Sequence, residues 1–127
     1  MRKKIPILLY CAHAELLSQM AFVLRVHSYE VIAISDSTAA VHASVLRKDL
    51  ACGLLVHTGQ GDPAGRLIHR ILDHDAEIPL LLVDLVGDLA PVRYANLVLY
   101  GHNTKPTHIL AALHLLCGKK AWARSGS

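Results

Sequence analysis

Reactive side chains stand at the ends of several short apolar runs of this sequence. Cys11 and His13 follow one run, His57 ends a second and Asp84 ends a third. Thiolate, imidazole and carboxylate groups are ligands that zinc accepts, and a cysteine or a histidine can also act as a nucleophile. These residue types therefore raise two chemical hypotheses, a metal site and a centre for covalent catalysis.

The residues around these side chains weaken both hypotheses. The chain has nine histidines scattered along it, so clustering does not distinguish His13 and His57. A cysteine that carries a phosphoryl group needs a nest of backbone amides and often an arginine, whereas Cys11 is followed by AHAELLSQ. A phosphoryl group on His57 would be repelled by Asp84. We therefore interpret Cys11 as a buried structural thiol, and we keep a small-ligand or metal sensor using Cys11, His57 and Asp84 as the alternative.

Apolar runs alternate with helical patterns along the chain. Five runs are typical of buried strands, and they cover residues 5–10, 29–35, 52–57, 78–86 and 97–100. Helical spacing or helix-start signals mark residues 16–24, 36–49, 61–75, 88–96 and 105–118, with Asp36 or Ser37 and then Asp62 as the predicted caps. This alternation predicts an α/β domain with a doubly wound, five-stranded parallel sheet. Sites in such sheets form at the carboxyl ends of the strands, where the reactive residues would meet.

Length, charge and cysteine content limit the function classes. The 127 residues fit one domain, which we place at residues 1–118, with a basic tail or the start of a linker at 119–127. Residues 5–118 hold seven Lys and Arg against ten Asp and Glu, so we expect no direct binding of nucleic acid. No apolar run approaches the roughly 20 residues of a membrane helix, so we expect no membrane partner. Three cysteines at unrelated spacings indicate a reducing cytoplasm.

Short matches along residues 4–118 carry a resemblance to a known family. ILLYCAHAE and YEVIAISDSTAAV are similar to its first two strands and the segments after them, and Gly65 falls where the family has a glycine after its phosphoacceptor loop. IPLLLVDL is similar to its fourth strand, and TKPTHILAAL is similar to the Lys-Pro that opens its last helix. On these residues the chain resembles the receiver domain of bacterial two-component response regulators, which have a flavodoxin-like fold.

The resemblance implies that the family's phosphorylation pocket is degenerate in this chain. The acidic pair that holds magnesium in the family corresponds to Cys11 and Ala12, the phosphoacceptor aspartate to His57, and the threonine or serine after it to Asp84. Only the lysine remains, as Lys105, with more residues between strand and lysine than the family has. Magnesium demands hard oxygen ligands, which this set does not supply. We therefore expect no ordinary aspartyl-phosphate cycle, and a fixed contact of Asp84 with His57 or Lys105 in its place.

The last predicted helix suggests where a partner binds. Ile109, Leu113 and Leu116 form its inward stripe, while His108, Ala111 and Leu115 lie on another side. The neighbouring segment 88–100, which includes Tyr94, also carries few charges. The resemblance implies that this face forms a homodimer or docks an output domain. We therefore predict an interaction face made of Tyr94, His108, Ala111 and Leu115.

Together these features predict a cytoplasmic signalling module that acts by protein–protein interaction. We expect no enzymatic activity and no cofactor, because the residues that would carry the family's chemistry are replaced. The low share of charged residues, 18%, supports surfaces that a protein partner covers.

Overall fold

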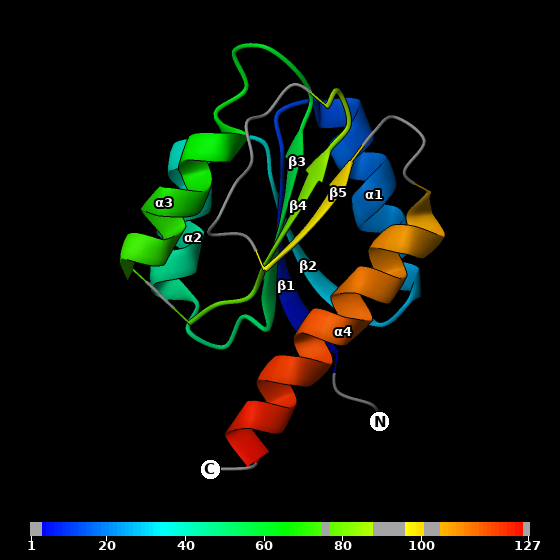
Figure 1. Cartoon of the computed structure of the whole chain (residues 1–127), viewed down its shortest axis with the longest axis vertical. Helices are drawn as coiled ribbons and strands as arrows, with labels where there is room; N and C mark the ends of the chain where they lie inside the picture. Colours follow the sequence, from blue (N-terminus) through cyan, green and yellow to red (C-terminus); the bar gives the residue numbers. More distant parts are fainter. Residues whose placement is uncertain (1–3, 75–76, 88–95, 101–104, 126–127) are drawn as a thin grey trace.

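Five parallel strands form one sheet in the part of the chain that the structure describes, as the sequence predicted. The computed structural model describes residues 4–74, 77–87, 96–100 and 105–125. The strands are β1 (Ile5–Cys11), β2 (Tyr29–Ile34), β3 (Cys52–His57), β4 (Leu80–Asp84) and β5 (Leu97–Tyr100). Their order in the sheet is β2-β1-β3-β4-β5, so β2 lies on one side of β1 and the later strands are added on the other side (Figure 1). This order is that of a doubly wound fold, whose sites lie outside the carboxyl ends of the strands.

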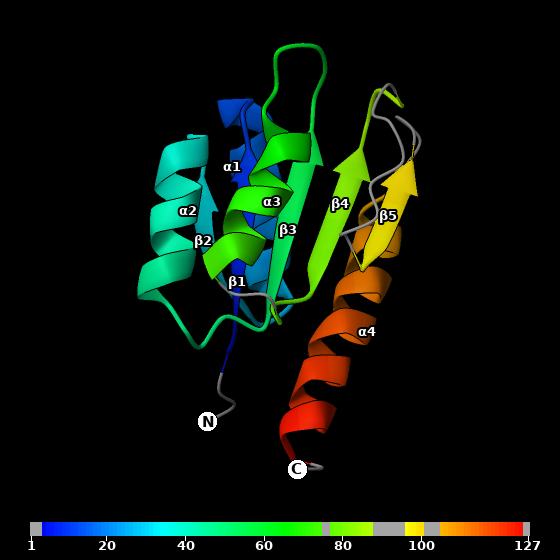
Figure 2. The ribbon, with the colours of Figure 1, turned by 60° about the vertical axis from the view of Figure 1, so that its left-hand side comes forward.

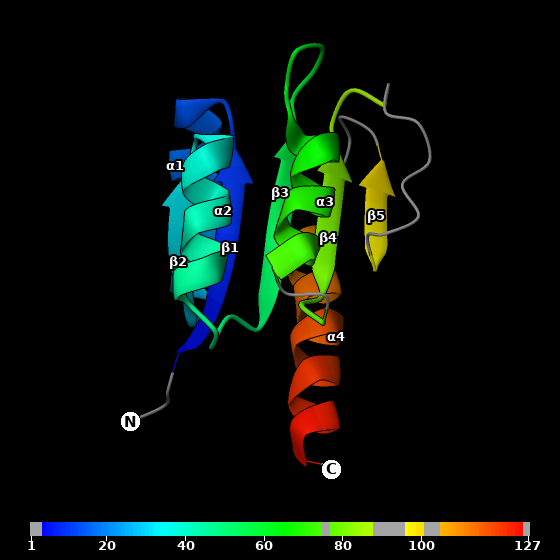
Figure 3. The same ribbon diagram turned by 90° about the vertical axis from the view of Figure 1, so that its left-hand side faces the viewer.

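Helices cover both faces of the sheet. The described residues form α1 (Ala14–Val26), α2 (Ser37–Leu46), α3 (Ala64–His74) and α4 (Pro106–Ser125). Figure 2 and Figure 3 show α2 and α3 together on one face, while α1 and α4 lie on the other. The weak helix predicted at residues 88–96 falls, except for Asn96, outside the described residues.

Two side chains fix the starts of two helices, and one of them, Asp36, stands at a predicted cap position. The carboxylate of Asp36 accepts a hydrogen bond of 2.8 Å from the backbone N–H of Ala39, which agrees with its predicted role as the cap of α2. Nδ1 of His13 accepts one of 3.3 Å from the backbone N–H of Leu16 at the start of α1. His13 was predicted as a candidate metal ligand, and the structure instead uses its imidazole as a helix cap.

The end predicted for the last helix is wrong. Gly118 was the predicted end of that helix, with residues 119–127 as a tail, whereas α4 continues to Ser125. A glycine inside a helix costs only about 1 kcal/mol relative to alanine. The residues after Gly118 include Lys, Ala and Arg, which favour helix, so the helix passes through the glycine.

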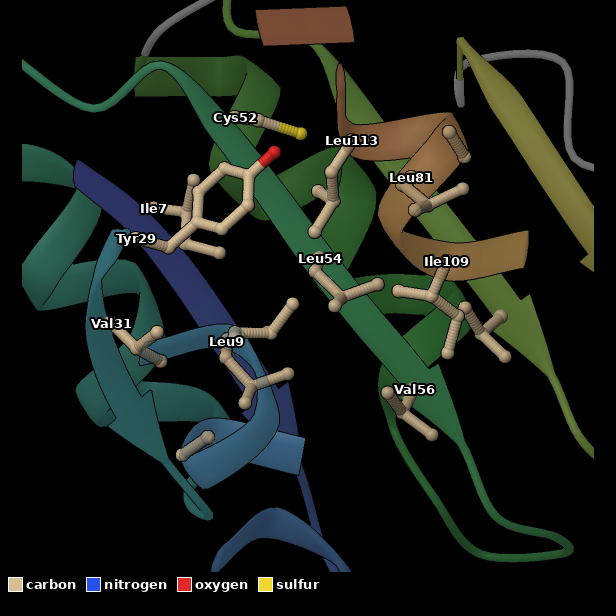
Figure 4. Close-up of a cluster of buried hydrophobic side chains, with 14 of the residues drawn as sticks. Ile7, Leu9, Tyr29, Val31, Cys52, Leu54, Val56, Leu81, Ile109 and Leu113 are labelled. Carbon is tan, nitrogen blue, oxygen red and sulfur yellow. The ribbon is translucent and has the colours of Figure 1, made fainter. Parts of the chain in front are cut away.

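The alternating side chains of the strands divide the core into two layers. Ile7, Leu9, Leu54 and Val56 pack with α1 and α4, and Figure 4 shows Ile109 and Leu113 of α4 meeting this layer. Leu8, Tyr10, Leu55 and Leu82 point to the opposite face and pack with α2 and α3. Successive residues of a strand point to opposite faces, so a shift of one residue moves a side chain from one layer to the other.

None of the described helices combines the length and the apolar character that a membrane span requires.

Candidate functional site

The predicted edge residues lie at the carboxyl ends of adjacent strands. Cys11 pairs in register with Val56, and His57 pairs with Asp84. Figure 2 shows β3, β4 and β5 ending at the same edge of the sheet. The topology therefore brings the ends of these strands together, as expected from the sequence.

The two layers of the core separate Cys11 from His57 and Asp84. Cys11 lies in the layer shared with α1 and α4, together with its register partner Val56. His57 directly follows Val56 and Asp84 directly follows Val83, which also belongs to that layer, so both polar residues point to the opposite face. The proposed ligand set of Cys11, His57 and Asp84 is therefore not assembled. Among the residues that the structure describes, His, Cys, Asp and Glu nowhere form a group of three that could hold a metal ion.

The thiol of Cys11 is a buried structural group. Cys11 has no solvent exposure, and its Sγ donates to the carbonyl oxygen of His13 at 3.6 Å. Burial raises the pKa of this thiol above its usual value. A nucleophilic cysteine needs an accessible site and a lowered pKa, so the structure supports the structural interpretation of Cys11.

Asp84 holds the turn that follows β4. Its side chain has no solvent exposure, and Oδ1 accepts hydrogen bonds from the backbone N–H groups of Val86 at 3.2 Å and Gly87 at 2.7 Å. Gly87 has a φ of 80°, a left-handed conformation that glycine adopts without steric cost. The carboxylate therefore closes a tight turn by accepting from two successive amides.

His57 is enclosed by the protein at the position where the resemblance places the phosphoacceptor. Only 3% of the residue is exposed, and its Nδ1 makes no contact with solvent. Its carbonyl oxygen accepts a hydrogen bond of 3.2 Å from the backbone N–H of Leu85, which anchors the end of β3 to the end of β4. A histidine buried in this way presents little of its ring to a phosphodonor.

Ala12 and Lys105 complete the predicted pocket and both are exposed. Ala12 offers a methyl group where the family has a carboxylate. Lys105 directly precedes α4, where its carbonyl oxygen accepts from the backbone N–H of His108 at 2.9 Å. The backbone N–H of Lys105 in turn donates to Nδ1 of His108 at 3.3 Å. The described contacts of Lys105 are thus those of a helix start.

A polar network centred on Asp62 was not predicted from the sequence. One carboxylate oxygen accepts from the hydroxyl of Tyr10 at 3.0 Å and from the backbone N–H of Ala64 at 3.0 Å. The other accepts from the backbone N–H of Thr58 at 2.9 Å and from its hydroxyl at 2.8 Å. Burial and the adjacent Asp62 carboxylate raise the pKa of Tyr10 above its usual value. Asp62 was expected only to cap the third helix, and it also ties the end of β1 to the loop after β3.

The described part of the predicted interaction face lies on the surface of α4. His108, Ala111 and Leu115 are exposed, and Leu115 has 68% of its surface open to solvent. Ile109, Leu113 and Leu116 are buried against the sheet, which agrees with the inward stripe expected from helical spacing. Tyr94, the fourth predicted member, lies outside the described residues. The role of this face in binding stays a prediction.

A groove between α1 and α4 is a further surface feature that the sequence analysis did not identify. It has a volume of about 320 Å³ and a mostly apolar lining. The residues that line it are Leu16, Gln19, Met20, Val23, Leu24, Leu85, Pro106 and Ile109.

Comparisons with known proteins agree with the fold. No family model matches the sequence, and no curated protein matches it. A response regulator receiver domain protein from Clostridium thermocellum is similar in structure, with a TM-score of 0.83 and 15% identity over 94% of this chain and 98% of that one. A structure described as adenylate cyclase from Rhodopirellula baltica has a TM-score of 0.84 and 15% identity over 97% and 94% of the two chains.

A third similar structure belongs to a longer protein. NtrX from Brucella abortus has a TM-score of 0.80 and 16% identity, with 94% of this chain covering 28% of that one. Several other similar structures are also receiver domains, among them one described as CheY-like from Methanospirillum hungatei. The strand order, the two helical layers and these similarities together show that the chain has the fold of response regulator receiver domains.

Proposed function

We propose that the chain is a signalling module that acts by protein–protein interaction and does not form an aspartyl phosphate. The observation that carries this proposal is the buried imidazole of His57 at the end of β3, where a receiver would need an accessible carboxylate. An acyl phosphate requires a carboxylate nucleophile. Cys11 and Ala12 supply no hard oxygen ligand in their side chains, so the magnesium that assists this reaction would have no acidic pair to bind.

The polar contacts at this edge also support a domain that works without a phosphoryl group. Oδ1 of Asp84 accepts from two backbone amides, and both carboxylate oxygens of Asp62 accept from Tyr10, Thr58 and Ala64. These groups hold the loops together without a phosphoryl group. A receiver changes its conformational equilibrium when a phosphoryl group binds at this edge. We infer that this domain either keeps one conformation or responds to a partner.

We propose the exposed surface of α4 as the face that meets a protein partner or an output domain. Leu115 is large, apolar and 68% exposed, and the small side chain of Ala111 lies one turn before it on the same side. The longer chain of NtrX supports the idea that a domain of this fold can form part of a larger protein. We further propose that the domain works in the cytoplasm, because its three cysteines are free and buried.

Phosphodonor treatment tests the first part of the proposal. The purified chain is incubated with magnesium and acetyl phosphate, or with beryllofluoride, beside a receiver domain that retains its aspartate. The control should gain a phosphoryl adduct by mass spectrometry and shift its amide NMR signals with beryllofluoride, while this chain should do neither. Phosphoryl uptake that disappears in His57→Gln or Asp84→Asn would contradict the proposal.

Site-specific photo-crosslinking tests the second part. A photoreactive residue is placed at position 115, and a matched one at position 46, where Leu46 of α2 is also exposed. Position 115 should give a discrete adduct with a protein partner in cells that express the chain, and position 46 should not. Equal adducts from both positions would contradict a specific face on α4.

A further inference from the structure

The outer surface of α1 exposes large apolar side chains that the fold does not use. Phe22 is the only phenylalanine of the chain and is 69% exposed, and Val26, one turn later, is 64% exposed. The opposite side of α1 carries Leu17, Ala21 and Leu24, which are buried against the sheet. A single exposed apolar residue is ordinary, but two neighbours at helical spacing form a patch that favours association.

This patch is continuous with the groove between α1 and α4. Gln19 lies one turn before Phe22 and Val23 lies one turn before Val26, and both of these residues line the groove. The lining residues outside α1 are Leu85, Pro106 and Ile109. The groove lies on the side of α1 away from Ala14 and Ser18, so the patch of Phe22 and Val26 on the outer surface, and not the groove, is the surface that a partner helix would contact.

The charges and the side-chain sizes along α1 favour a second copy of the same helix as the partner. We propose that this surface binds the same surface of a second copy of the chain, with the two α1 helices antiparallel and the two-fold axis near position 20. Glu15 and Arg25 are equally distant from that position, so the acidic side chain of each copy would face the basic side chain of the other. Both residues are exposed, and Glu15 lies in the first turn while Arg25 lies in the last.

The same arrangement matches large side chains with small ones. Phe22 of one copy faces Ser18 of the other, and Val26 faces Ala14. Ser18 and Ala14 are exposed, so nothing in the described part of the chain covers the positions that would receive the two apolar side chains. Each contact occurs twice because a two-fold interface repeats every pair.

Other orientations lack this complementarity. A parallel pair would place Glu15 beside Glu15 and Arg25 beside Arg25, which brings like charges together. The guanidinium of Arg25 also donates to the carbonyl oxygen of Val31 at 3.1 Å, so its side chain is already held and loses less freedom when it meets an acidic partner. The antiparallel pair is closed, which limits the assembly to a dimer.

Sedimentation of the full chain tests this dimer. The wild-type protein should change from monomer to dimer as its concentration rises toward about 1 mM, since a small interface gives weak association. Phe22→Glu should raise the dissociation constant by about thirtyfold or more, as the loss of a central anchor does. Leu46→Glu on α2, where an apolar side chain is also exposed, is the matched control and should leave the dissociation constant unchanged. A wild-type monomer throughout, or a dimer lost in Leu46→Glu and kept in Phe22→Glu, would overturn the inference.

Cysteine crosslinking tests the orientation. The three native cysteines are buried, so engineered surface thiols report on the contact. A mixture of Ala14→Cys and Val26→Cys chains should form a disulfide-linked pair under mild oxidation by a soluble disulfide, which accepts the two electrons and protons. Either variant alone should stay largely unlinked. Linking of Ala14→Cys with itself, and not in the mixture, would show a parallel pair and overturn the antiparallel arrangement.

Discussion

The carboxyl edge of the sheet and the outer surfaces of α1 and α4 differ in which side chains they bury and which they expose. At the edge, Asp84 is buried and Asp62 is partly buried, and both accept hydrogen bonds from the protein itself. On the helices, Phe22 and Leu115 expose most of their apolar surface to solvent. The edge therefore contains the residues that suggest chemistry, while the helices contain the surfaces that remain open to another molecule.

This contrast separates polar groups that are used inside the fold from apolar groups that are left outside it. His57 and Asp84 have almost no exposed surface, whereas Phe22 and Leu115 expose most of theirs. Buried side chains contribute more to the free energy of unfolding than exposed ones, so substitutions in the two regions should change it by different amounts.

The largest difference is expected within α4. Leu113 has no solvent exposure whereas Leu115 is 68% exposed, although both are leucines of one helix. Leu113→Ala removes a core side chain and should lower the free energy of unfolding by about 3 to 4 kcal/mol. Leu115→Ala should change it by less than about 0.5 kcal/mol. Urea denaturation of the two variants measures the difference, and equal losses would show that Leu115 is covered in the folded protein.

The next largest effect is expected at the Asp62 network. Asp62→Ala removes the acceptor for Tyr10, Thr58 and Ala64 and should lower the free energy of unfolding by about 2 to 3 kcal/mol. Asp62→Asn retains one carbonyl oxygen and should cost about half as much. The exposed Asp73 of α3 supplies the control, because Asp73→Ala should have little effect. A loss in Asp62→Ala no greater than in the control would show that the network is not stabilising.

A smaller effect is expected at the turn after β4. Asp84→Asn keeps a side-chain oxygen for the N–H groups of Val86 and Gly87 but weakens these bonds by removing the charge, which should cost about 1 kcal/mol. Gly87→Ala adds a Cβ at a φ of 80° and should cost a similar amount, about 1 kcal/mol. Chemical denaturation checks both variants, and a stabilised Asp84→Asn protein would show that the buried charge is a net cost.

Sequence reasoning predicted the strands and their edge well because both follow from local patterns. Apolar runs and caps such as Asp36 are recognised within a few residues, and the alternation of strands and helices predicts a doubly wound parallel sheet. The face to which each edge residue points was harder to predict. The predicted first strand ended at residue 10, whereas β1 includes Cys11, and a shift of one residue moves a side chain to the other layer. The contact between Tyr10 and Asp62 joins residues 52 positions apart, so no local pattern could indicate it. The helical passage through Gly118 required weighing a single glycine against the helix formers that follow it.

Alkaline pH compares a tyrosine at the polar edge with one in the apolar core, because Tyr10 contacts Asp62 and Tyr29 lies in the layer shared with α1 and α4. Burial raises the pKa of Tyr29, in the layer of α1 and α4, from 10.0 to about 12, and the pKa of Tyr10 at the polar edge is also raised. The folded state therefore binds these protons more tightly than the unfolded chain. The contribution of Tyr29 to stability is complete below pH 10 and is lost as the pH rises toward 12, and that of Tyr10 begins to fall over the same range and is lost at higher pH.

Phenylalanine substitutions separate the two tyrosines. Tyr29→Phe should flatten the fall of the free energy of unfolding between pH 10 and 12 while changing its value at neutral pH only slightly. Tyr10→Phe should also flatten that fall, but it removes the bond to Asp62 and should lower the neutral value by about 1 kcal/mol. Denaturation across this pH range checks both. If Tyr10→Phe were neutral at pH 7, the hydroxyl of Tyr10 would contribute no net stability, and the polar edge would depend on Thr58 and the backbone amides alone.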